Sequence, residues 1–310
     1  MNAITKDTRK SQEALSLHKM IPLCFIIILV IGLFARLWQF GHIPGGINQD
    51  EAFSGYEAYS ILHSGKDSSG YRFPVYLTAW GSGMNALNSY LMIPFIALFG
   101  LKTWVIRIPQ VLVAVLSLIA VYFLVKKIFG AYPALFCMFF TTIAPWHIFL
   151  SRWGLESNLA PGFLLFGLCF FVYGLERPKL LLLSAGMYGL SLYCYATIWP
   201  FVPLILILQA VYCLFYKKLS FSRELLFSIL LLGILALPLF LFLLVNMGVI
   251  PEICLPFLSI PRLLYMRSGE ISFQNIPENF QNLWQILSTQ TDGLAWNATD
   301  RFGIFYPITL

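Results

Sequence analysis

Two adjacent carboxylates, Asp50 and Glu51, follow directly after the first apolar segment of the chain. An ionised group next to hydrocarbon costs a few kcal/mol, so such a group is kept where it faces water, a partner or a substrate. From this pair to Leu62, apolar side chains recur at helical spacing, which predicts a short amphipathic helix on the membrane surface. Asp50 then stands at the N-terminus of that helix, where it either does chemistry or only caps the helix.

A second group of polar residues lies in the stretch PWHIFLSRWGLE, which contains Trp146, His147, Arg152 and Glu156. Arg152 and Glu156 are either chemically active or a simple i, i+4 ion pair on a helix, which contributes a few tenths of a kcal/mol when exposed. His147 is either a structural histidine or a substrate contact. Trp146 either anchors the membrane interface or contacts a substrate.

Arginine side chains are the candidates for binding an anion, because the planar guanidinium donates two parallel hydrogen bonds to phosphate oxygens. Arg107 and Arg152 are the best placed of them in the sequence. Arg36, inside the outer third of the first apolar segment, is a weaker candidate for binding the anion, or a side chain that only extends its charged head to the interface. Glu57 and Asp67 are expected to face solvent.

The composition excludes a soluble domain and predicts a polytopic, all-α transmembrane protein. Of the 310 residues, 59% are hydrophobic and 11% are charged, with a mean hydropathy of +0.77. The net charge of +6 is gathered in short clusters between apolar segments, which indicates membrane orientation and not nucleic-acid binding. The six cysteines lack metal-ligand spacing and are read as packing residues. No metal site and no cofactor is predicted.

Hydropathy divides the chain into four parts. A cytoplasmic tail is expected over residues 1–20, a transmembrane module over 21–250, an external loop over 251–301 with a short helix at 276–287, and the start of a further span over 302–310. Because a half-span leaves backbone groups unsatisfied in lipid, a longer protein is expected. Within the module, the predicted spans are 21–40, 105–125, 131–150, 159–175, 180–198, 200–216 and 225–250.

The distribution of Lys and Arg predicts the topology. Segment 87–100 contains Pro94 and is shorter than the roughly 20 residues that a spanning helix needs, so it is expected to lie in the interface or to dip in and return. If this segment does not cross the membrane, the basic clusters at 126–127, 177–179 and 217–223 all fall on the cytoplasmic side. The external loops at about 41–104 and 151–158 then share the outer face, and Asp50 and Glu156 are expected to meet there.

Three stretches together resemble a known family. They are QDEAFSGYEAYSILHSGKD, YLMIPFIALFGLKTWVIRIPQ and KKIFGAYPALFCMFFTTIAPWHIFLSRWGLESNLA. In this order they are similar to the membrane glycosyltransferases of the GT-C fold, in particular the bacterial type of the protein O-mannosyltransferase and aminoarabinose-transferase-like group. The resemblance covers roughly residues 20–200 and implies a GT-C-like helical fold, with a large first external loop that carries interfacial helices.

The resemblance also implies an activity at the outer face of the plasma (inner) membrane. A sugar would pass from a polyprenyl-phosphate carrier to a protein, lipid or glycan acceptor, with Asp50 as general base. A phosphate leaving group needs no carboxylic acid to protonate it, so a cation is expected to balance its charge. The second loop has no Asp-X-Asp, so metal-dependent oligosaccharyl transfer fits poorly. The resemblance points to Asp50 and Glu156; with the residues singled out by their chemistry, the predicted catalytic residues are Asp50, Glu51 and Glu156, and the predicted substrate-binding residues are Arg107, Arg152, His147 and Trp146.

A transporter or flippase of a lipid-linked or anionic substrate is the main alternative. Transporters place ionisable residues or broken helices near the middle of the bilayer, in paired halves. Here the carboxylates gather at one predicted face and no paired halves are found. The sequence therefore favours the enzyme, and a scaffold that needs nothing of Asp50 is the third possibility.

Overall fold

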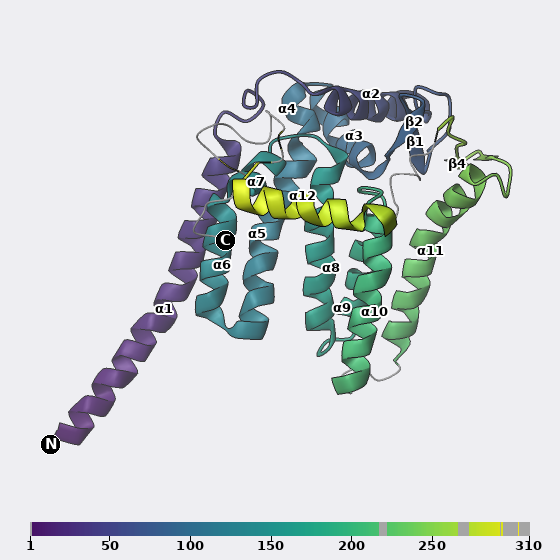
Figure 1. Cartoon of the computed structure of the whole chain (residues 1–310). Coiled ribbons are helices and arrows are strands. Elements are labelled where there is room, and N and C mark those ends of the chain that lie inside the picture. Colours follow the sequence, from purple (N-terminus) through teal and green to yellow (C-terminus); the bar gives the residue numbers. More distant parts are fainter. Residues whose placement is uncertain (1, 217–221, 266–272, 292, 294–302, 304–310) are drawn as a thin grey trace.

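The computed structural model describes residues 2–216, 222–265, 273–291, 293 and 303. Its main body is a bundle of roughly parallel helices, and one end of the bundle is covered by a layer of shorter helices and hairpins (Figure 1). The all-α prediction is confirmed, with two short hairpins added to it. The bundle helices are α1 (Asn2–Leu37), α5 (Ile108–Phe129), α6 (Ala131–Ile143), α8 (Ala160–Gly174), α9 (Leu180–Ser191), α10 (Ile198–Tyr216) and α11 (Arg223–Asn246).

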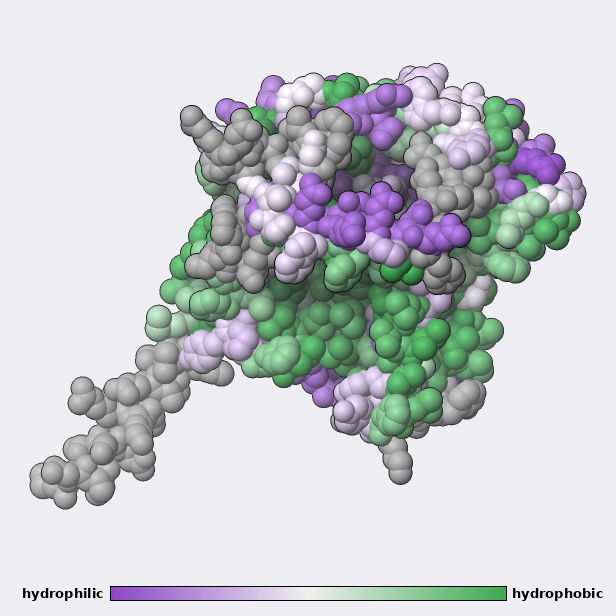
Figure 2. Space-filling model, in the orientation of Figure 1, coloured by the Kyte–Doolittle hydropathy of each residue, from purple (hydrophilic) through white to green (hydrophobic). Residues whose placement is uncertain are grey.

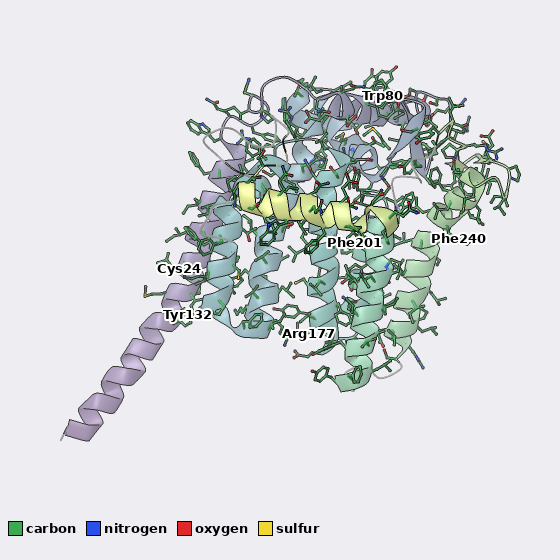
Figure 3. All side chains as sticks on the ribbon, viewed as in Figure 1. Cys24, Trp80, Tyr132, Arg177, Phe201 and Phe240 are labelled. Carbon is green, nitrogen blue, oxygen red and sulfur yellow. The ribbon has the colours of Figure 1, made fainter. Side chains whose placement is uncertain are left out.

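Five helical segments of the described chain are long and apolar enough to cross a membrane. They are Met20–Leu37, Thr103–Phe129, Glu156–Gly174, Ile198–Tyr216 and Arg223–Asn246. The surface agrees, since the visible face of the bundle is hydrophobic below a more hydrophilic layer (Figure 2). Phe201 and Phe240 point outward from the bundle and are more than half exposed, at 53% and 57% (Figure 3). The chain is a multi-pass membrane protein.

Two of the predicted spans are interrupted. The segment predicted as one helix over 131–150 breaks at Ala144, between α6 and the short helix α7 (Pro145–Leu150). Proline disfavours helical backbone in the residue before it, and Ala144 has an extended ψ of 123°. The segment predicted over 180–198 stays helical only to Ser191 and continues in turns. Both shorter helices pack beside longer neighbours, α6 against α5 and α9 against α8 and α11.

The layer at the end of the bundle begins with α2 (Gln49–Ser64). Its N-cap is Asn48, whose side chain accepts a hydrogen bond from the backbone N–H of Asp50 at 2.8 Å, while Glu51 accepts one from the Asn48 N–H at 3.0 Å. This reciprocal arrangement satisfies two of the free N–H groups at the helix start. The capping role that the sequence left open for Asp50 therefore belongs to Asn48.

The rest of the layer packs around α2. Helix α3 (Leu87–Phe99) lies against α2 in this layer and leads into α4 (Thr103–Ile106) (Figure 1). Strands β1 (Tyr76–Ala79) and β2 (Ser82–Asn85) form an antiparallel hairpin. Its two turn residues, Trp80 and Gly81, both have positive φ, at 52° and 79°, as a tight hairpin turn with the right twist requires.

A second hairpin ties the distal part of the chain to this layer. Strands β3 (Ile253–Leu255) and β4 (Leu258–Ile260) pair antiparallel, and the Val75 N–H donates to the Ser259 carbonyl at 3.0 Å. Tyr76 stacks on Phe242 of α11 with ring centroids 4.4 Å apart, within the largest core cluster. This core joins the layer to the bundle.

Beyond this hairpin, the helix predicted at 276–287 is confirmed as α12 (Ile276–Thr289), which crosses in front of the bundle. The span expected to start at 302–310 lies outside the described residues, apart from Gly303.

Candidate functional site

The first external loop and the loop after α7 touch each other at the end of the bundle that carries α2. The Gly154 N–H donates to Glu51 Oε1 at 2.6 Å, and the Asn85 N–H donates to the Glu156 carboxylate. Both bonds are buried and join residues far apart in the sequence. The prediction that these two loops share one end of the molecule is confirmed.

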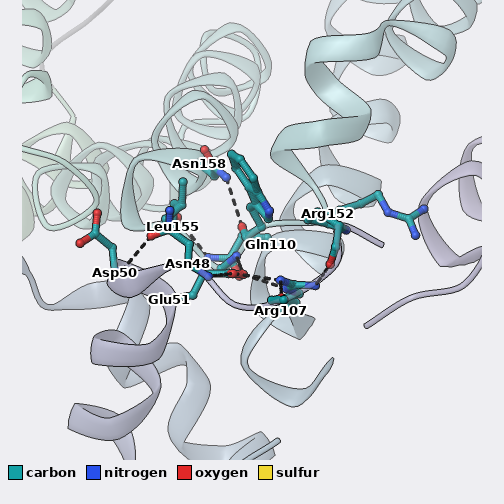
Figure 4. A network of polar contacts seen from close by, with 12 residues as sticks. Asn48, Asp50, Glu51, Arg107, Gln110, Arg152, Leu155 and Asn158 are labelled. Atoms are coloured by element: carbon teal, nitrogen blue, oxygen red, sulfur yellow. Dashed lines mark hydrogen bonds and ion pairs between the residues drawn. The ribbon is translucent and has the colours of Figure 1, made fainter. Parts of the chain in front are cut away.

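Glu51 is the centre of the polar network in Figure 4. Its carboxylate pairs with Arg107 through two parallel bonds, Nε to Oε1 at 2.8 Å and Nη2 to Oε2 at 2.9 Å. The N–H groups of Gly154 and Asn48 donate to the same two oxygens. A carboxylate has about four lone-pair sites, and these four donors occupy them.

Arg107 is fully buried, and its guanidinium N–H groups donate to other atoms of the protein. Besides Glu51, it binds the carbonyl oxygens of Pro44 and Gly46 at 3.1 and 2.9 Å. These contacts fix the turn that enters α2. Arg107, predicted to bind a substrate phosphate, lies beneath the start of α2 and holds the backbone there together with the Glu51 carboxylate.

Arg152 binds backbone carbonyls near the end of α1. Its guanidinium donates to the carbonyl oxygens of Ile43 at 3.0 Å, of Ala35 at 2.9 Å and of Trp38. Because these carbonyls lie at and just after the end of α1, Arg152 satisfies acceptors that the helix leaves open. The Arg152 side chain thus points back to α1, while the Glu156 carboxylate accepts from the backbone of Asn85 at the end of β2.

His147 is buried beside Arg36, with its Nδ1 2.7 Å from Arg36 Nη2. Arg36 also donates to the Gly32 and Thr142 carbonyls at 3.0 and 3.2 Å and has no exposed surface. The expectation that Arg36 extends to the interface is wrong, because α6 and α7 cover it. Trp146 and His147 both line a cavity of about 150 Å³ between α5, α6, α7 and α8.

Asp50 differs from both other carboxylates. It occupies the first turn of α2, is exposed, and points away from the buried network, while its neighbour Glu51 points into it (Figure 4). No hydrogen bond or ion pair to its carboxylate is found among the described residues. Of the predicted catalytic carboxylates, Asp50 is the one with free acceptor oxygens.

Two buried amides, Asn88 and Gln110, also belong to the network, and a third, Asn85, is buried near it; the sequence reasoning missed all three. Asn88 Nδ2 donates to the Gly154 carbonyl at 2.7 Å, and Gln110 Nε2 donates to Asn88 Oδ1 at 2.6 Å. Asn85 is 2% exposed, and its amide has no partner in the described part of the chain. The sequence carries one signal for these amides. Gln110 lies within the apolar run of α5, and a buried amide there needs a hydrogen-bond partner. No group of three or more possible metal ligands occurs among the described residues.

Glu57 and Asp67 are buried, at 1% and 4% exposure, so the expectation that they face solvent is wrong. Glu57 accepts from the Ser68 N–H at 2.8 Å, and Asp67 Oδ1 accepts from the Tyr71 N–H at 2.7 Å. Asp67 Oδ2 has no partner in the described structure. Burial, with repulsion from Glu57, raises the pKa of Asp67 to about 6. The loop after α2 folds over both carboxylates.

This raised pKa predicts a pH-dependent stability. Between pH 4 and pH 6 the folded protein keeps a proton on Asp67 that the unfolded chain releases, so stability falls as the pH rises through this window. One pKa unit corresponds to about 1.4 kcal/mol, so the total loss is on the order of 3 kcal/mol. Thermal unfolding of an Asp67→Asn variant should lack this decline, and the same change at exposed Asp50 should leave it in place. A decline that persists in Asp67→Asn would assign it to another group.

Comparison with known proteins agrees with this architecture. The family model described as dolichyl-phosphate-mannose-protein mannosyltransferase matches residues 86–245, which is more than half of the chain. The chain belongs to this family. The match includes Arg107, Arg152 and Glu156 and begins after Asp50 and Glu51. Among curated proteins, none matches this chain.

Solved structures share the fold. ArnT from Cupriavidus metallidurans in the apo state has a TM-score of 0.55 at 16% identity, over 76% of this chain and 44% of that one. The same enzyme bound to undecaprenyl phosphate gives 0.52 at 17%, over 75% and 43%. The archaeal oligosaccharyltransferase AglB from Archaeoglobus fulgidus, in complex with an inhibitory peptide and a dolichol-phosphate, gives 0.52 at 15%, over 72% and 29%. The GT-C fold expected from the sequence is confirmed, and the chain spans less than half the length of each of these proteins.

Proposed function

We propose that this protein transfers a sugar from a polyprenyl-phosphate carrier to an acceptor, with Asp50 as the general base. The observation that carries the proposal is the exposed carboxylate of Asp50, which has no partner among the described residues and lies in the first turn of a helix whose start is fixed by its neighbour Glu51. Family membership and the fold shared with ArnT and AglB support the reaction class.

The chemistry assigned to Asp50 is a single proton transfer coupled to substitution. The acceptor oxygen or nitrogen attacks the anomeric carbon, its proton passes to the Asp50 carboxylate, and the bond from the anomeric carbon to the phosphate oxygen breaks. The phosphate leaves with the electron pair of that bond, so no acid is needed on its side. A carboxylate within hydrogen-bond reach of the acceptor typically contributes about 10²- to 10⁴-fold.

The other predicted site residues are assigned by their contacts. Arg107 and Glu51 fix the turn before α2, and Arg152 fixes the end of α1 and the Ile43 carbonyl. We infer that these residues position Asp50 and do not touch the donor phosphate. Glu156, which binds the backbone of Asn85 at the end of β2, remains a candidate for orienting the acceptor. Trp146 and His147 border the small cavity and remain candidate substrate contacts.

A transfer assay tests the proposal. The purified full chain in lipid nanodiscs is incubated with undecaprenyl- and dolichyl-phosphate-linked hexoses, together with extracted envelope material as acceptor. Release of free polyprenyl phosphate, measured by mass spectrometry, is the expected result. A folded protein, judged by a cooperative thermal transition, that releases none from either donor above a protein-free control would refute the proposed reaction.

The orientation in the membrane is part of the proposal and gives a separate prediction. We place the layer with α2 outside and the N-terminus in the cytoplasm, because Lys126, Arg177 and Lys179 lie at the opposite end of the bundle, where Figure 3 labels Arg177. In a variant without its native cysteines, Trp80→Cys should react with an impermeant maleimide in intact cells, because this position is 63% exposed at the outer layer. Lys179→Cys should react only after the cells are permeabilised, and the reverse pattern would invert the topology.

A further inference from the structure

A second cavity, of about 370 Å³, lies at the same end of the molecule as Asp50 but beyond the other end of α2. Its lining includes Lys66, Tyr71, Arg72, Cys254, Leu255 and Ser259. Helix α2 has 16 residues and is therefore about 24 Å long, so this cavity is separate from the surface around Asp50.

The walls of this cavity come from two segments distant in sequence and held together by hydrogen bonds. The Tyr71 hydroxyl donates to Glu252 Oε2 at 3.1 Å, next to the start of β3. The Val75 N–H donates to the Ser259 carbonyl at 3.0 Å, and Pro74 bridges to Ser259. The loop after α2 and the β3–β4 hairpin thus form one fixed frame around the space.

Two cations line this space. Lys66 and Arg72 lie directly opposite each other in an antiparallel bridge, and both line the cavity. Neither side chain makes an ion pair or hydrogen bond within the described part of the chain. The Glu252 carboxylate lies beside the cavity, where it accepts from the Tyr71 hydroxyl, and Asp67 is buried behind the loop. Like charges opposite each other across two strands repel, so an anion bound between Lys66 and Arg72 would reduce that repulsion.

The rim of the cavity is apolar on the hairpin side. Leu255 lines it and is 41% exposed, and Phe257 in the adjoining turn is 70% exposed. A cationic pocket beside exposed apolar side chains suits a ligand with a charged head and an apolar body. The same pocket also suits a free phosphate ion, which has the charge but no apolar body.

We propose that this cavity is a binding site for a phosphate group, held between Lys66 and Arg72. This site does not depend on the proposed sugar transfer. It is remote from Asp50, and it is tested by measuring phosphate binding instead of sugar transfer.

Binding is tested with the full chain in two probe series. In the first, inorganic phosphate is titrated calorimetrically against protein in neutral detergent. In the second, native mass spectrometry counts phosphatidic acid retained from nanodiscs that also contain phosphatidylcholine. Each charge-assisted contact removed should weaken binding about tenfold, so Lys66→Gln with Arg72→Gln should lose about 100-fold. Lys66→Arg should retain most of the affinity.

Lys102→Gln is the matched control, because Lys102 is an exposed cation in the same layer and outside the cavity. It should leave binding unchanged, as should Asp50→Asn. Retention of phosphatidic acid without binding of inorganic phosphate identifies the ligand as a lipid head group, and binding of both identifies phosphate as sufficient. Equal loss in the Lys102 control and the double variant, or binding unaffected by the double variant at an unchanged melting temperature, overturns the site.

Discussion

An Asp50→Asn variant is expected to lose sugar transfer by a factor of about 10² to 10⁴ while it folds as the wild type does. Asparagine has nearly the same shape as aspartate but does not accept the acceptor proton at neutral pH. The side chain is exposed and makes no hydrogen bond or ion pair in the described structure, and the cap of α2 is supplied by Asn48. The loss should therefore appear in kcat and not in the melting temperature.

Single-turnover release of polyprenyl phosphate is the measurement, because it separates the chemical step from donor binding. Glu278→Gln is the matched control, since Glu278 is an exposed carboxylate in α12, away from the network around Glu51. This control should retain wild-type turnover. If Asp50→Asn also turned over at the wild-type rate, the proton would have to go elsewhere, and the mechanism proposed for Asp50 would be wrong.

The arrangement of the segments around this site could be predicted from the sequence, because hydropathy and clusters of basic residues are properties of whole segments. Excluding the short segment 87–100 brought the two loops to one end, and the bond from Gly154 to Glu51 shows that they meet. The same reasoning did not foresee the break at Ala144. There a single proline, Pro145, divides a continuous apolar run into α6 and α7.

The roles of individual charged residues could not be predicted in the same way. Asp50 and Glu51 are equivalent in a linear sequence, but successive residues of an α-helix point about 100° apart, so one faces outward and the other inward. Which one is buried depends on Arg107 and Gly154, distant residues that only the folded chain brings close. Arg36 was misassigned for the same reason, since its partners are in α6 and α7.

The buried pair of Glu51 and Arg107 should be the most sensitive point of the fold. Breaking a buried ion pair by removing one partner typically costs about 3–5 kcal/mol, because the other charge stays buried without compensation. Side-chain exposures of 0% for Glu51 and 1% for Arg107 put the pair in this class. Arg107→Met should therefore destabilise the protein strongly. It would leave the Glu51 carboxylate with its two backbone donors, Gly154 and Asn48, and without a counter-charge.

Denaturant-induced unfolding in detergent is the measurement, with Lys127→Gln as the matched control. Lys127 also forms an ion pair, with Glu176 at 2.5 Å, but the two side chains are 28% and 65% exposed. Removing an exposed partner costs about 0–1 kcal/mol. Glu51→Gln combined with Arg107→Met should be less destabilised than the sum of the two single variants, because neither charge is then left alone.

Variants of the same pair distinguish a positioning role of Glu51 from a catalytic role. If Glu51 only orients the start of α2, then Glu51→Gln should lower stability and turnover together, and Glu51→Gln with Arg107→Met should recover part of both. If instead Glu51 accepts the substrate proton, Glu51→Gln should lose turnover by the factor expected for Asp50→Asn, and the second substitution should recover none of it. The four donors on the Glu51 carboxylate predict the first result.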